Sequence, residues 1–169
     1  IATRHDSHAD LVAAALRAGK HTFVEKPLAI TNEGLETVQQ AWSECSANSP
    51  KILMVGFNRR FAPLVQRMKR LLAGVREPKA FIVTVNAGYI PREHWTQDPQ
   101  VGGGRLIGEA CHFIDLLRYL AGAPIASWYV QTIGGESTLI KDDKATITLT
   151  FADGSLGTIH YFANGHKEF

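Results

Sequence analysis

Two residues of the sequence carry the side chains that alcohol oxidation requires. Lys26 lies in the tripeptide Glu25-Lys26-Pro27, and His112 lies within the glycine-led run at residues 102–115. When hydride leaves the carbon of a secondary alcohol, a base must take the hydroxyl proton and a cation must stabilise the developing negative charge. Histidine carries a proton near neutral pH, and lysine supplies the cation. The pair predicts hydride transfer to or from a carbinol carbon.

Each of these side chains also has a simpler interpretation. A lysine at a strand end is usually a solvated surface residue, and a single helical histidine is more often a hydrogen-bonded interior residue. Asp115 follows His112 by one helical turn, where it either orients the imidazole or is a solvated helix residue. Three glycines, at positions 102–104, precede the histidine and would permit a close approach of the backbone to a ligand.

Strand and helix patterns alternate over residues 1–57. Ser7 and Asp10 resemble a capping box at the start of a helix, and Gly19 ends that helix. Its predicted buried face consists of Leu11, Ala14, Ala15 and Ala18. Residues 21–24 are a short strand that leads into Glu25-Lys26-Pro27.

Thr31 then caps a second helix, which residues 48–50 end, and residues 51–57 have the apolar pattern of a strand buried on both faces. This order of elements is the later half of a doubly wound α/β domain, where ligands bind at the carboxyl ends of the strands.

The pattern changes after residue 57. A helix begins at Pro63, a strand occupies residues 79–87, and a loop-rich segment leads to a helix over residues 108–120. Further strands are predicted at residues 128–133, 144–151 and 155–162, and Asp153-Gly154 forms the hairpin between the last two. We expect an open antiparallel or mixed sheet with helices on one face, so the chain as a whole is of the α/β (α+β) class.

Composition narrows the choice of partner. The 169 residues are 45% hydrophobic and have a formal net charge of +2, with no block of like charge that would indicate a nucleic-acid or membrane partner. The two cysteines, Cys45 and Cys111, do not make a disulfide framework, which favours the cytoplasm. No apolar stretch is long enough to span a bilayer, and the start at Ile1 predicts that the chain begins within a longer protein.

Four motifs, in order, carry a resemblance to a known family. They are residues 3–27, the run at 56–61, the run at 102–115 and the Asp153-Gly154 hairpin. Together they resemble the glucose-fructose oxidoreductase and inositol dehydrogenase (Gfo/Idh/MocA) family. The resemblance implies that residues 1–57 are the C-terminal half of a Rossmann-type domain binding NAD or NADP. It also implies that residues 58–169 are a substrate domain whose open sheet supports a homo-oligomer.

The resemblance further implies roles for individual residues. Lys26 would lie by the nicotinamide and contact the reacting hydroxyl, and His112 would be the general base, with Glu109 as a further catalytic residue. Substrates would be sugars, inositols or nucleotide sugars. The residues expected to contact the cofactor are Thr3, Arg4, His8, Glu25, Lys26, Pro27 and Arg60. Those expected to contact the substrate are Trp95, Arg105 and His112.

The sequence departs from the pattern of the family at three points. Gly108 stands where an Asp usually precedes the catalytic histidine by four residues, and Glu109 next to it either takes over that role or is an acid favoured by the helix dipole. Thr3-Arg4-His5 replaces the commoner Thr-Pro-Asn, which changes the edge that faces the cofactor. No glycine-rich dinucleotide loop is found in the sequence.

Other classes of function remain open. A protein that keeps the fold without hydride transfer, as a binding or regulatory module, is favoured by Gly108, and a segment that mainly makes oligomer contacts is a third possibility. A thiol nucleophile at Cys111 lacks an orienting group. A metal site formed by His5, His8, Cys111 and His112 matches no compact zinc spacing.

Overall fold

The computed structural model of the chain describes residues 1–46, 51–134 and 143–164. These residues form two compact units. The first unit comprises the described residues up to 57 together with residues 93–108, and the second comprises residues 58–92 and the described residues from 109 onward. The unit boundary after residue 108 therefore lies within the segment that leads to His112.

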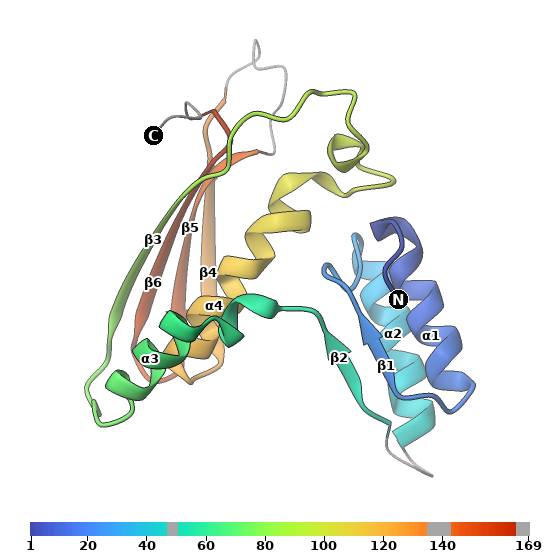
Figure 1. Cartoon of the computed structure of the whole chain (residues 1–169), viewed down its shortest axis with the longest axis horizontal. Helices are drawn as coiled ribbons and strands as arrows, with labels where there is room; N and C mark the ends of the chain where they lie inside the picture. Colours follow the sequence, from blue (N-terminus) through green and yellow to red (C-terminus); the bar gives the residue numbers. More distant parts are fainter. Residues whose placement is uncertain (47–50, 135–142, 165–169) are drawn as a thin grey trace. The chain divides into compact units, whose positions relative to one another are not determined.

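A parallel strand pair and two helices make up most of the first unit (Figure 1). β1 (Thr22–Val24) pairs in parallel with β2 (Leu53–Val55). α1 (His8–Arg17) follows the short 3₁₀ turn η1 (His5–Ser7), and α1 packs against α2 (Asn32–Ser46). The buried apolar residues of this unit are Ala9, Val12, Ala13, Leu16, Val24, Val38 and Ala41.

The buried face of α1 differs from the predicted one. Val12 and Leu16 are fully buried, whereas Leu11 is 42% exposed and Ala14 also faces solvent. The capping box is wrong too, because the Ser7 hydroxyl donates to the Arg4 carbonyl and caps no helical N–H. Alanines of α1 occur on both the buried and the exposed face of the helix. The apolar pattern alone therefore does not distinguish the two faces.

Thr31 caps α2 as predicted, since the Gly34 N–H donates to the Thr31 hydroxyl at 3.1 Å. The predicted end of this helix, at residues 48–50, lies outside the described residues. The prediction that residues 51–57 are buried on both faces is wrong. Among the described residues β1 is the one strand paired with β2, and Ile52 and Met54 are 66% and 43% exposed.

A four-stranded mixed sheet forms the second unit, in the order β3-β6-β5-β4. β3 (Ala80–Asn86) runs parallel to β6 (Leu156–Phe162), while β5 (Lys144–Phe151) is antiparallel to both β6 and β4 (Ile125–Thr132). Helices α3 (Pro63–Leu72) and α4 (Cys111–Ala121) lie on one face of this sheet (Figure 1). The predicted mixed sheet with helices on one face is therefore confirmed.

The helix-covered face of the sheet holds the core of the second unit. Gly157 lets β6 and α4 approach each other, because a Cβ there would lie 2.8 Å from Leu117. The buried apolar residues of this unit are Ala110, Phe113, Leu117, Leu120, Ala145, Ile147, Leu149, Phe151, Ile159, Tyr161 and Ala163. The opposite face remains open and carries Ile82 and Leu156, which are 76% and 50% exposed.

A π-helical turn, η4 (Leu106–Ala110), leads directly into α4. The sequence predicts a helix over residues 108–120 but not this wider turn, which contains Gly108 and Glu109. The helix ends where predicted, at Gly122, whose φ of 77° is left-handed. No helix of the described residues is long and apolar enough to cross a bilayer.

The corrected face of α1 makes a matched pair of variants. Leu16→Ala should lower the free energy of unfolding by about 2–5 kcal/mol, because it leaves a cavity in the core of the first unit. Leu11→Ala on the same helix should change it by less than about 1 kcal/mol. Urea unfolding followed by circular dichroism measures both, and equal losses would contradict the packing of α1.

Candidate functional site

Three segments meet at the carboxyl edge of the β1–β2 pair. Glu25 and Lys26 follow β1, and Gly56 follows β2. The amino group of Ile1 donates to the Phe23 carbonyl and the Glu25 N–H donates to the Ile1 carbonyl, so the chain start lies beside β1. Thr3 and Arg4 consequently emerge at the edge where open α/β sheets bind ligands.

Lys26 is held by the backbone of the glycine-rich segment. Its ammonium group donates to the Gly108 carbonyl at 2.8 Å, and the side chain is half-buried. The Lys26–Pro27 peptide bond is cis. Lys26 is therefore not a solvated surface lysine.

His5 and Trp95 pack together beside this lysine. The His5 ring meets the Trp95 ring edge-on with centroids 4.8 Å apart, and the Arg4 guanidinium lies 5.7 Å from the Trp95 centroid. Trp95 begins the short turn η3 (Trp95–Gln97). The His5 Nδ1 lies 2.8 Å from the Gly102 carbonyl, so the imidazole also anchors the glycine run.

His8 joins two segments of the edge through its ring nitrogens. Nδ1 lies 2.7 Å from the Pro27 carbonyl and Nε2 lies 3.1 Å from the Thr3 carbonyl, and the residue is fully buried. A contact between either nitrogen and a cofactor would replace one of these backbone bonds. The predicted cofactor contact of His8 therefore stays a prediction.

The glycines at 102 and 103 pack against the chain itself. A Cβ on Gly102 would lie 2.4 Å from the Thr96 Cα, and one on Gly103 would lie 2.8 Å from the Ile30 side chain. Gly103 also has a φ of 75°. At these two positions the close backbone approach that we predicted for a ligand is made by other residues of the first unit. Arg105, two residues further on, is 4% exposed and belongs to the same unit.

His112 lies in the first turn of α4 and is 8% exposed. Asp115, one turn later, accepts hydrogen bonds from Arg60 of η2 (Asn58–Phe61), one of them from Nε at 3.0 Å and the other from Nη2. Asp115 is thus buried and ion-paired, so the alternative of a solvated helix residue is wrong, and an orienting role toward His112 stays a prediction. Arg60 ties η2 to α4, and its predicted place near the cofactor stays a prediction.

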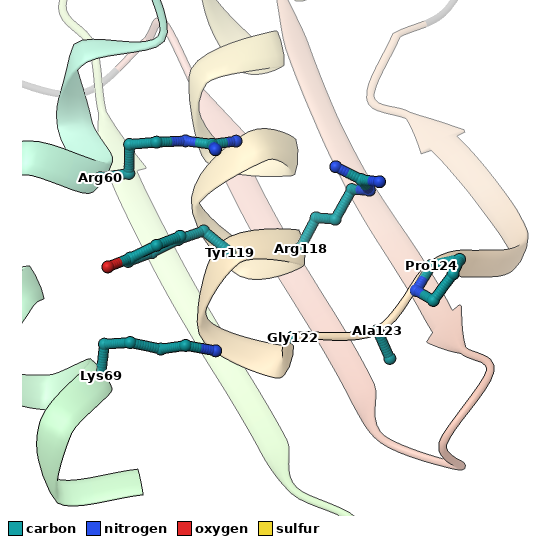
Figure 2. A pocket seen from close by; sticks show the side chains of 7 residues that line it. All are labelled: Arg60, Lys69, Arg118, Tyr119, Gly122, Ala123 and Pro124. Atoms are coloured by element: carbon teal, nitrogen blue, oxygen red, sulfur yellow. The ribbon is translucent and has the colours of Figure 1, made fainter. Parts of the chain in front are cut away.

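Arg60 also lines a surface pocket of about 300 Å³ in the second unit (Figure 2). Two cations lie near the ring of Tyr119. The Arg60 guanidinium is 5.3 Å from the ring centroid, and the Lys69 ammonium is 5.4 Å from it. Lys69 donates to the Leu120 carbonyl at 3.2 Å, which stabilises the end of α4. Figure 2 shows Arg118 on the other side of α4, so these cations do not converge on one point. None of the other predicted site residues lines this pocket.

Glu109 is anchored to the sheet of the second unit. Its carboxylate accepts a hydrogen bond of 2.5 Å from the hydroxyl of Tyr161, a fully buried residue of β6. This contact spans 52 positions, and no pattern in the sequence predicts it. A catalytic role for Glu109 stays a prediction.

Two family models match the sequence of the chain. Residues 1–57 match the model described as the oxidoreductase family with an NAD-binding Rossmann fold, and residues 65–168 match the GFO/IDH/MocA C-terminal domain. The chain belongs to the Gfo/Idh/MocA family.

Several members of the family are similar to the chain over nearly all of its length. A 1-carboxy-3-chloro-3,4-dihydroxycyclohexa-1,5-diene dehydrogenase of Comamonas testosteroni is 32% identical over 95% of the chain and 42% of its own length. An inositol 2-dehydrogenase of Saccharopolyspora erythraea is 32% identical over 97% of the chain and 47% of its own. A solved structure of levoglucosan dehydrogenase with NADH and levoglucosan is 26% identical, covers 98% of the chain and 47% of its own, and has a TM-score of 0.81. The chain spans about half the length of these family members or less.

The predicted site residues divide between the two units. The first unit contains Thr3, Arg4, His8, Glu25, Lys26, Pro27, Trp95 and Arg105, and the second contains Arg60, Glu109 and His112. From the sequence, His5 is a candidate only in a metal-site alternative, although the residue contacts the glycine segment that also holds Lys26. Its one sequence signal is the departure from the Thr-Pro-Asn pattern of the family.

Burial, the largest contribution, lowers the pKa of His5 below its ordinary value of 6.5, and the nearby Lys26 charge adds to this, while the Gly102 bond opposes it. As the pH falls through 6.5, the unfolded chain binds a proton that the folded chain resists, so the free energy of unfolding should fall. This loss should be smaller in His5→Asn, which has no titrating ring. Chemical unfolding of both proteins between about pH 7.5 and 5.5 measures the difference. An identical pH dependence would contradict the lowered pKa.

Proposed function

We propose that the whole protein is an NAD(P)-dependent oxidoreductase that transfers a hydride between a nicotinamide and a carbinol carbon of a sugar, inositol or nucleotide sugar. The observation that carries the proposal is the Lys26 ammonium at the carboxyl edge of β1, held by the carbonyl of Gly108 only four residues before His112. Relatives named as inositol and levoglucosan dehydrogenases, the latter solved with NADH, support this class of reaction.

The residues at the carboxyl edge fit the nicotinamide end of such a cofactor. Thr3, Arg4 and Glu25 are exposed there, and the Glu25 carboxylate lies over Gly56, where a Cβ would come within 3.0 Å of Oε2. We assign cofactor contacts to these residues, to Lys26 and Pro27, and to Arg60 of the second unit. When bound, the nicotinamide accepts or supplies the hydride.

The chain's own residues would handle the proton and the charge. His112 takes the hydroxyl proton of the alcohol on a ring nitrogen as the carbon–hydrogen bond breaks, and it returns that proton in the reverse direction. The Lys26 ammonium stabilises the negative charge that develops on the oxygen. Trp95 and Arg105 contact the substrate, and Glu109 is a further catalytic residue.

We also propose a domain organisation, an oligomeric state and a cellular location for the protein. Residues 1–57 are the later half of the cofactor domain, and residues 58–169 belong to the substrate domain, whose segment 93–108 is part of the first compact unit. The open sheet face exposes Ile82 and Leu156, which supports pairing with a second copy in a homo-oligomer. The absence of a disulfide framework between Cys45 and Cys111 supports a place in the cytoplasm.

One observation favours a second candidate, a binding or regulatory protein that has lost hydride transfer. Position 108 has no side chain, and the neighbouring Glu109 carboxylate is bonded to Tyr161. Such a protein would still bind a nicotinamide or a sugar ligand without turnover. Retention of both Lys26 and His112 favours the enzyme.

Replacing the lysine tests the enzyme directly. Lys26→Ala in the whole protein should lower turnover by on the order of a hundredfold or more, the usual scale for losing one charge-stabilising group. Lys20→Ala, at an exposed lysine of the same unit, is the control and should leave turnover unchanged. Steady-state rates with inositol and sugar substrates measure the effect, and a normal rate for Lys26→Ala would exclude the assigned role.

Cofactor binding separates the two candidates from a protein with no nucleotide site. In a fluorescence titration, NADH should bind the whole protein and should bind the 169-residue chain much more weakly, because this sequence has no glycine-rich pyrophosphate loop. Binding with turnover supports the enzyme, and binding without turnover supports the regulatory protein. No binding by the whole protein would contradict the proposal.

A further inference from the structure

The imidazole of His5 lies against the one position of the π turn that has no side chain. A Cβ built on Gly108 would lie 3.1 Å from the His5 Cε1, tighter than an ordinary van der Waals contact. Gly108 is not among the glycines with a positive φ, so its backbone does not itself require glycine. The ring of His5 therefore disfavours a side chain at this position.

The ring has little freedom to move away from Gly108. Its Nδ1 is bonded to the Gly102 carbonyl at 2.8 Å, and the Trp95 ring packs on it edge-on. Gly102 in turn is fixed by its contact with the backbone of Thr96. His5 thus touches both ends of the segment from 102 to 108, at one end through a hydrogen bond and at the other through packing.

The same segment supplies the acceptor for Lys26. The Gly108 carbonyl accepts the hydrogen bond of the Lys26 ammonium group, and the His5 ring packs against the same residue. A displacement of this residue would move the carbonyl and release the ammonium group. We infer that His5 is a positioning residue for Lys26, acting through the backbone of Gly108, and that residues 5 and 108 are coupled. The importance of Lys26 for hydride transfer rests on the proposed function, whereas the contact itself does not.

A double-mutant cycle on the whole protein tests the coupling. Gly108→Ala alone should lower the melting temperature because of the contact with the ring. His5→Asn keeps a nitrogen able to donate to the Gly102 carbonyl but removes the ring atoms that face Gly108. In that background Gly108→Ala should raise the melting temperature by about 2–4 °C, since alanine favours a helix over glycine. The same shift in both backgrounds would overturn the coupling.

The reactivity of Lys26 tests its positioning without any assay of activity. Acetic anhydride labelling, read by mass spectrometry, compares the acylation rate of Lys26 with that of the exposed Lys20 in the same sample. In His5→Ala the relative rate at Lys26 should rise roughly tenfold, because a hydrogen bond from a charged donor is lost. His21→Ala is the matched control, as this histidine accepts from the Ile52 N–H elsewhere in the first unit and should leave the ratio unchanged.

His5→Gln, which lacks a nitrogen at the Nδ1 position, replaces the alanine variant if circular dichroism shows that His5→Ala is unfolded. An unchanged Lys26 rate in a folded His5 variant would overturn the inference while leaving hydride transfer intact. Failure of the whole protein to bind NADH would sink the proposed function instead, and it would not alter the labelling result.

Discussion

The hydrogen bond from the Lys26 ammonium to the Gly108 carbonyl links segments that are 82 positions apart. A bond from a charged donor in a half-buried place is stronger than one between neutral groups, so it constrains both partners. It requires Lys26 to leave the carboxyl end of β1 toward the glycine run, and it requires that run to return to the first unit. The exposed Arg4 lies over the ring of Trp95, and that ring packs on His5 beside this connection.

The space near that bond is shared among a few residues. His5 occupies the volume in front of Gly108, and a usual Asp there together with the His5 ring would overfill it. The two departures from the family pattern, at positions 5 and 108, therefore lie in direct contact with each other.

Features set by local chemistry were predictable from the sequence. The Thr31 cap, the left-handed Gly122 and the Asp153-Gly154 hairpin each depend on a few neighbouring residues. The buried face of α1 was not predictable, because its alanines give almost no contrast between sides. Contacts of His5 with Gly102 and of Glu109 with Tyr161 were also hidden, since they join positions 97 and 52 residues apart. The order of the motifs identified candidate residues of the site, but it did not predict the hydrogen bonds and packing contacts between them.

Gly108 and Glu109 are consecutive residues, but each is bonded to a different compact unit. The carbonyl of the first binds Lys26 in one unit, and the carboxylate of the second binds Tyr161 in the other. Both lie in the π turn, a geometry that is frequent at functional sites. His112 follows Glu109 by three residues on a continuous helix, so its register along α4 is set by the same anchor. A change at residue 109 would therefore disturb the proposed base before it disturbed the lysine, although the two anchored residues are adjacent in the chain.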